Sequence, residues 1–203
     1  MVEIMEKGGI ILWIITFLSV IAAVVIIERF LYFRKIRIDE ERMINRLRGV
    51  LQKGHYDEAL SICENHPAPI TNLMKVGIEH RMYSRETIRE AIMDAASLEV
   101  PQMEKHLPLL GTISYVAPLL GLLGTVTGNI RAFGVIGKLG AIGDPGLLAR
   151  GIAEALITTA AGLIVAIPTV IFYNHLVSKV NHSIIRLENR VNELVLLLGG
   201  KPI

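Results

Sequence analysis

Three long apolar stretches divide the chain, and charged or glycine-rich segments separate them. The first is Ile10–Ile27, an uninterrupted run that would cover about 27 Å as a helix. The other two are Leu107–Phe133 and Gly151–Tyr173, which contain little charge and are each long enough to cross a bilayer. The pattern predicts an all-α integral membrane protein with three transmembrane helices, which we place at residues 10–30, 107–133 and 151–173.

The residues before the first span do not resemble a secretory signal. Residues 1–9 carry two acids and one lysine, whereas a signal begins with a basic segment, and no small-residue cleavage site precedes the later charges. We therefore expect a short external tail followed by a retained anchor.

The distribution of positive charge predicts the orientation. Basic residues crowd the segment directly after the first span, and cytoplasmic loops carry such an excess. The loop 134–150 is glycine-rich and nearly free of them. We expect the N-terminus and this loop to be periplasmic and the C-terminus cytoplasmic. The crowded basic residues are Arg34, Lys35, Arg37, Arg42, Arg46, Arg48 and Lys53.

The segments 31–106 and 174–203 are predicted to form cytoplasmic helices. One short helix should cover Tyr56–Glu64 and end before the prolines at 67 and 69. A long helix should start after Ser84 and run towards Leu107. The segment Asn174–Leu198 is amphipathic, so we expect a helix that continues past the membrane and packs on the cytoplasmic segment or on neighbouring subunits.

Composition excludes several classes of function. The chain has 203 residues, 52% of them hydrophobic, and a net charge of only +2, which argues against nucleic-acid binding. Its single cysteine cannot form an internal disulfide, and its six histidines show no metal-ligand spacing. No phosphate loop or nucleophile elbow is present, so we expect neither an enzyme nor a bound cofactor or metal.

The second and third spans each carry a face of small residues, which lets membrane helices approach closely. On the third span this face also carries Glu154, Thr158 and Thr159, within a wedge of roughly 140°. A carboxylate at membrane depth is costly and is by default a functional hypothesis. Alternatively, Glu154 is a structural acid that reaches interfacial water or pairs with Arg131 or Arg150, and the threonine hydroxyls only bond back to their helices.

Two stretches together carry a family resemblance. Ala117–Phe133, APLLGLLGTVTGNIRAF, and Gly151–Asn174, GIAEALITTAAGLIVAIPTVIFYN, are similar to the two hallmark segments of the MotA/TolQ/ExbB proton channel family. Length, span order and topology agree with the ExbB and TolQ branch, because the MotA branch has an extra span and a larger cytoplasmic domain.

The resemblance implies a ring, a homopentamer in known members, whose pore is lined by the second and third spans. Single-span partners of the ExbD/TolR type would sit inside it, each with an essential aspartate, and a TonB/TolA-type protein would use the resulting motion. Matched by motif, the polar pore residues are Thr125, Glu154 and Thr159. Thr158 stands where the ExbB pattern often has alanine, which leaves open which threonine faces the partner.

The function expected from these features is energy transduction by an inner-membrane proton channel. Hydroxyls can order water, and burial raises the pKa of a carboxylate, but this chain supplies only one such acid, so a partner aspartate would complete the relay. The small residues expected to pack the pore helices closely are Gly121, Gly124, Gly128, Ala155 and Gly162. The alternative is a non-conducting membrane scaffold; the system served and the choice of H⁺ or Na⁺ stay open.

Overall fold

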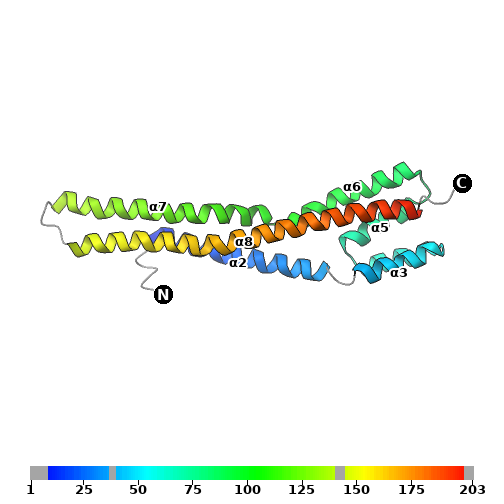
Figure 1. The fold of residues 1–203 in the computed structure, drawn as a ribbon, viewed down its shortest axis with the longest axis horizontal. Coiled ribbons are helices and arrows are strands. Elements are labelled where there is room, and N and C mark those ends of the chain that lie inside the picture. The colour runs from blue at the N-terminus through cyan, green and yellow to red at the C-terminus, as the bar shows by residue number, and fades with distance from the viewer. Residues whose placement is uncertain (1–8, 37–39, 140–144, 199–203) are drawn as a thin grey trace. The chain divides into compact units, whose positions relative to one another are not determined.

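The computed structural model describes residues 9–36, 40–139 and 145–198, and the regular elements in these ranges are all α-helices. The all-α prediction is therefore confirmed (Figure 1). The helices are α2 (Gly9–Ile36), α3 (Glu40–Gln52), α4 (Tyr56–Asn65), α5 (Pro69–Glu79), α6 (Arg85–Glu104), α7 (Leu107–Leu139) and α8 (Pro145–Leu198).

Three of the helical stretches are long and apolar enough to cross a membrane. They lie within Gly9–Ile36, Arg85–Gly134 and Gly151–Leu196, and only 22% to 39% of each apolar window is buried inside the chain. On α2, for example, Trp13, Phe17 and Val24 are all exposed. Such extensive uncovered apolar surface requires lipid or other protein around it. The chain is thus a multi-pass membrane protein with three candidate spans.

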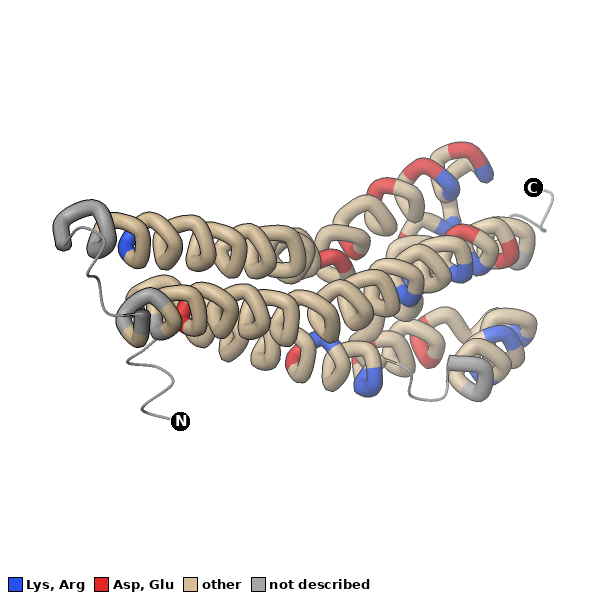
Figure 2. Tube along the Cα trace, turned by 60° about the vertical axis from the view of Figure 1, so that its left-hand side comes forward, with Lys and Arg blue, Asp and Glu red and all other residues tan. Residues whose placement is uncertain are grey.

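The chain forms two compact units, which share α2 and α8. The first unit contains Met1–Arg29 and His106–Leu176, and the second contains Phe30–Lys105 and Val177–Ile203. Charged residues are few along α7 and the first half of α8, whereas they are frequent on the helices of the second unit (Figure 2). The units therefore separate the apolar spans from the polar helices.

The helices of the first unit extend further than predicted. α7 continues past Phe133 to Leu139, and α8 begins at Pro145, so helix covers most of the segment predicted as a loop. Glycine is tolerated in membrane helices, which explains why the glycines of this segment do not end α7 at Phe133. α8 continues without interruption to Leu198, as expected for a span that extends beyond the membrane.

The second unit contains the two helices that the sequence predicts. α4 begins at Tyr56 and ends at Asn65. α6 begins directly after Ser84, whose hydroxyl accepts a hydrogen bond from the backbone N–H of Thr87 at 3.3 Å and so caps the helix. Ile88 and Ile92, about one turn apart on this helix, are buried.

Two further helices of the second unit, α3 and α5, were not predicted. In α3 the buried Ile44, Leu47 and Leu51 recur at helical spacing, a signal that the surrounding basic residues obscure. α5 starts at Pro69, a residue interpreted above only as a terminator, although proline is also favoured in the first turn of a helix.

The last part of α8 packs on the other helices of its own chain. Gly77 of α5 lies so close to Leu194 of α8 and Ile92 of α6 that a methyl group on it would approach them to 2.8 and 2.9 Å. Glu193 of α8 also pairs with Arg48 of α3. Of the two partners expected for this amphipathic helix, segment 31–106 of the same chain is therefore one.

Candidate functional site

α7 and α8 lie side by side in the first unit and touch through small residues (Figure 1). A Cβ placed on Gly162 would lie 2.5 Å from the carbonyl oxygen of Ala117, and one on Gly128 would lie 2.8 Å from Ala155 Cβ. The two backbones are in contact because these positions lack bulk. We call this contact the α7–α8 seam; it consists of Gly121, Gly124 and Gly128 of α7 and Ala155, Thr158 and Gly162 of α8.

Thr158 lies inside this seam. Its side chain is 3% exposed, its hydroxyl donates to the carbonyl of Ala155 at 2.8 Å, and Gly124 packs directly against it. Of the two adjacent threonines, Thr158 is thus the one that α7 of the same chain covers.

Thr159 and Thr125 are more exposed than Thr158. The Thr159 hydroxyl donates to the carbonyl of Gly121 on α7 at 2.9 Å, and the Thr125 hydroxyl donates to Leu122 of its own helix at 2.7 Å. Both side chains are half-buried, and each oxygen can still accept a hydrogen bond. Thr125 follows Gly121 by about one helical turn, which places it on the same side of the seam as Thr159.

Glu154 is half-buried beside a small pocket of about 30 Å³. The pocket is also lined by the first turn of α2 and by Thr127 and Arg131 of α7. A space of this size holds one or two water molecules. Neither Thr127 nor the approach of α2 was predicted. Thr127 was visible in the GTVTG motif, but the proximity of α2 arises from tertiary packing.

The structural alternative for Glu154 named two arginines as partners. Arg131 lines the same pocket, yet within residues 9–36, 40–139 and 145–198 no ion pair joins it to Glu154. The side chain of Arg150 lies outside the described residues.

The predicted polar wedge of α8 therefore faces two directions. Glu154 and Thr159 are five residues apart, which separates them by about 140° around the helix. The seam occupies the middle of this arc, so Glu154 lies on one flank with the small pocket, and Thr159 lies on the other with Thr125. This arrangement presents a carboxylate that can exchange a proton with water on one flank, and hydroxyls that can order water on the other.

Known proteins are similar to this chain, two of them over most of its length. An ExbB homologue from Methanothermobacter thermautotrophicus is 30% identical over 92% of this chain and 66% of its own. The biopolymer transport protein ExbB-like 1 of Synechocystis sp. is 39% identical over 85% of this chain and 68% of its own. The Tol-Pal system protein TolQ of Haemophilus influenzae is 43% identical over 47% of this chain and 43% of its own. The chain thus spans about two thirds of the length of the first two relatives.

The family model of the MotA/TolQ/ExbB proton channel family matches residues 65–189, which include the seam, Glu154 and the threonines. The match covers more than half of the chain, and the family consists of channels rather than enzymes. With both hallmark segments inside the matched range and three candidate spans around them, the chain belongs to the MotA/TolQ/ExbB proton channel family.

Proposed function

We propose that this chain is a subunit of an inner-membrane proton-channel motor of the ExbB/TolQ type. With an ExbD/TolR-type single-span partner, it would couple the proton-motive force to work by a TonB/TolA-type protein across the periplasm, such as energised uptake through the outer membrane. The relatives named ExbB and TolQ support this proposal. By the same resemblance we propose a homopentamer with a periplasmic N-terminus and a cytoplasmic C-terminus.

The observation that carries the proposal is the position of Glu154 in an apolar helix beside a pocket with room for water. A carboxylate in such a place can bind and release a proton, whereas an acid that served packing alone would need no adjoining water site. Thr127 supplies a hydroxyl next to the same space.

We assign the opposite flank of the seam to the partner span. Thr125 and Thr159 present hydroxyl oxygens there that can still accept a hydrogen bond from water or from a partner carboxylic acid. Because Glu154 lies about 140° away, a proton that passes from the partner to Glu154 needs water or a neighbouring subunit between the flanks. Thr158 is buried in the seam, where it holds the two helices together, and it also lines the small pocket beside Glu154.

The test is proton flux in liposomes that contain this chain and a single-span protein of the ExbD/TolR type. Uptake is followed with a pH-sensitive dye under an imposed potential, and about 2.3 kcal/mol per 100 mV drives each charge. We expect Glu154→Gln and Thr159→Val to lower the flux at least tenfold. The matched controls are Glu104→Gln and Thr112→Val, which alter an exposed acid on α6 and an exposed threonine on α7.

If the double variant Glu154→Ala with Thr159→Val conducts as well as the wild type, these residues do not form the path. If the wild-type complex assembles but no preparation conducts, the scaffold alternative replaces the channel motor.

A further inference from the structure

The two threonines of the GTVTG motif in α7 lie on different flanks of the α7–α8 seam. Thr125 and Thr127 are two residues apart, which separates them by about 200° around the helix. Thr125 is on the same side of the seam as Thr159, whereas Thr127 lines the small pocket beside Glu154. The motif therefore supplies one hydroxyl to each flank.

The Thr127 hydroxyl directs its proton at its own helix. It donates to the carbonyl of Leu123 at 2.9 Å and to that of Gly124 at 3.2 Å. A threonine hydroxyl has a single proton and two lone pairs, so the oxygen of Thr127 acts towards the pocket as an acceptor. Thr158, the other hydroxyl that lines the pocket, donates to Ala155 at 2.8 Å and is in the same state.

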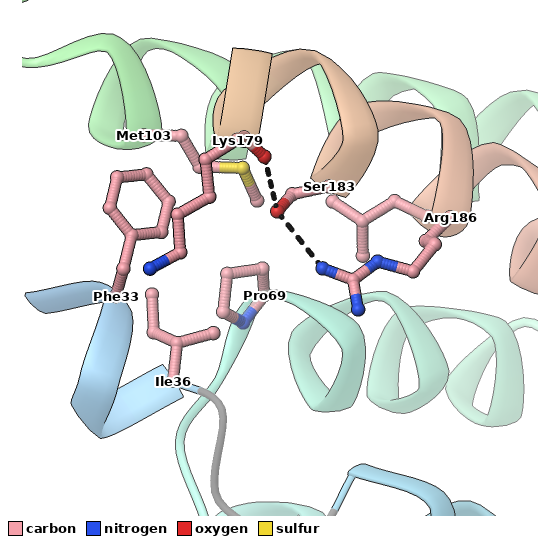
Figure 3. Close-up of a pocket in the computed structure, with 8 residues that line it drawn as sticks. Phe33, Ile36, Pro69, Met103, Lys179, Ser183 and Arg186 are labelled. Atoms are coloured by element: carbon pink, nitrogen blue, oxygen red, sulfur yellow. Dashed lines mark hydrogen bonds between the residues drawn. The ribbon is translucent and has the colours of Figure 1, made fainter. Parts of the chain in front are cut away.

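A serine of the second unit shows that a hydroxyl in this state still accepts a hydrogen bond. Ser183 of α8 donates to the carbonyl of Lys179 at 2.9 Å and accepts from Arg186 Nη2 at 3.4 Å (Figure 3). A bond back to the helix thus leaves the hydroxyl oxygen available for a second partner.

The polar lining of the small pocket suits a water molecule. Among the described residues that line it, two hydroxyls accept and the guanidinium of Arg131 donates. The Glu154 carboxyl group accepts when it is ionised and donates when it is protonated. A neighbour that serves both forms of the acid must itself donate and accept, which water does, and a polar space of about 30 Å³ holds one.

We propose that Thr127 is a positioning residue that holds this water against Glu154. The water donates one hydrogen to the Thr127 oxygen. Its second hydrogen then donates to the ionised carboxylate, or its oxygen accepts from the protonated acid. Proton uptake is the transfer of one proton from a hydronium ion at this position to the carboxylate, which leaves water and the neutral acid. This inference rests on the proposed function, because it assigns a role to Thr127 at the same site.

The alternative is that Thr127 only bonds back to its own helix, as threonines in helices commonly do. Thr112 of α7 has that arrangement, since its hydroxyl donates to the carbonyl of Pro108 at 2.9 Å and it does not line the pocket. Both threonines bond to the carbonyl four residues earlier in one helix, so Thr112→Val is a matched control for Thr127→Val.

The first test observes Glu154 itself and needs no proton flux. Infrared difference spectra of the detergent-solubilised full chain, between pH values at which Glu154 is protonated and ionised, contain the C=O band of the protonated carboxyl group. Glu154→Gln identifies this band by its loss. We expect Thr127→Val to shift the band to higher frequency, because the acid loses the water to which it donates. Thr127→Ser should keep the wild-type band, and so should Thr112→Val.

The second test is proton flux in the liposomes that contain the ExbD/TolR-type partner. We expect Thr127→Val to lower the flux about fivefold, which corresponds to the loss of one hydrogen bond. Thr127→Ser and Thr112→Val should stay within about twofold of the wild type, because neither removes a hydroxyl from the pocket. Thr127 is half-buried, so Thr127→Val should fold, and Thr127→Ala gives the same prediction if it does not.

Three results would overturn the role of Thr127. The first is an unchanged Glu154 band in Thr127→Val, and the second is an equal shift in Thr112→Val, which would reduce the effect to the helix itself. The third is wild-type flux in Thr127→Val. A wild-type complex that assembles but does not conduct would instead reject the proposed function, and the infrared band would then decide on Thr127 alone.

Discussion

Of the three threonines predicted for the pathway, Thr159 is the one whose hydroxyl donates to another helix. Thr159→Val keeps the shape of the side chain and removes this bond to Gly121. Interhelical hydrogen bonds in membrane proteins contribute about 0.6 kcal/mol on average, so we expect a loss of that order in the free energy of unfolding.

The measurement is denaturant-induced unfolding in mixed micelles, with Thr112→Val as the control. The Thr112 hydroxyl donates to the carbonyl of Pro108 in its own helix, at 2.9 Å, so Thr112→Val should lower the free energy of unfolding by less. Equal losses in the two variants would show that the bond to Gly121 contributes no stability of its own.

Cys63 gives a prediction about pH. The thiol is buried in α4, and burial raises its pKa from 9.0 to about 11. At pH 8 the thiolate is therefore about 100-fold scarcer than in the unfolded chain, and alkylation by iodoacetamide should be slower by at least that factor. Because the folded pKa is the higher one, the stabilising contribution of the neutral thiol is complete below pH 9 and is lost as pH rises to about 11.

The rate of alkylation should rise about tenfold per pH unit from pH 8 to 10, and the denatured chain provides the reference. A rate in the folded protein that levels off near pH 9 would contradict the raised pKa.

The sequence predicted which residues belong to the candidate site, but it predicted only part of how their side chains are placed. The motif indicated Glu154 and Thr159, and the structure places both on the flanks of one helix contact. Helical periodicity could not separate Thr158 from Thr159, because both lie on the small polar wedge of α8. The packing of Gly124 against Thr158 makes that distinction, and it depends on where α7 lies.

At the scale of elements, the α7–α8 seam depends on the absence of side chains. A Cβ on Gly124 would overlap the Thr158 hydroxyl and lie 2.6 Å from Thr158 Cβ. Thr158 is enclosed, so we expect Gly124→Ala to destabilise the protein by about 1 to 3 kcal/mol.

The control for this substitution is Gly134→Ala on the same helix, where a Cβ meets nothing within 4 Å. It should be neutral or stabilising by up to about 1 kcal/mol, because alanine is the better helix former. Melting temperatures of the two variants in detergent provide the measurement, and similar temperatures would mean that the seam tolerates a methyl group.

The cap of α6 gives a second prediction at this scale. Ser84→Ala removes the acceptor for the N–H of Thr87 and should cost about 1 kcal/mol, whereas Ser84→Asp should retain most of that stability. Ser97→Ala is the control, since the Ser97 hydroxyl donates to Asp94 within the helix interior and caps nothing. Amide hydrogen exchange of the first turn of α6 reports the difference; unchanged exchange in Ser84→Ala would exclude a role for the cap.

Helices with a start signal or a long apolar pattern could be predicted from the sequence, and those with ambiguous signals could not. The cap at Ser84 and the length of the apolar spans were unambiguous signals. Pro69 can end one helix or begin another, and the segment after Phe133 combines glycines with apolar residues that suit either a loop or a membrane helix. Only the surroundings of each segment resolve such cases.

At the scale of the whole molecule, the two units differ in where their apolar residues lie. The first exposes Phe17, Val24 and Ile164 along spanning helices, while the second buries Leu47, Ile92 and Val191 among charged helices. The sequence predicted this division, because apolar and charged residues are segregated along the chain. The ring could not be derived in the same way, since lipid and a neighbouring subunit cover apolar surface equally well.

Orientation is the last property that belongs to the whole molecule, and charge asymmetry predicts it. The basic residues after the first span should hold the second unit in the cytoplasm, so Ala149 near the start of α8 should be outside and Asn192 near its end inside. Both side chains are exposed, whereas Cys63 is buried and can be replaced by serine to provide a background without thiols. In intact spheroplasts, a membrane-impermeant maleimide should label Ala149→Cys and leave Asn192→Cys unlabelled; after permeabilisation both should react. The reverse pattern would place the second unit outside and would contradict the orientation that the basic residues predict.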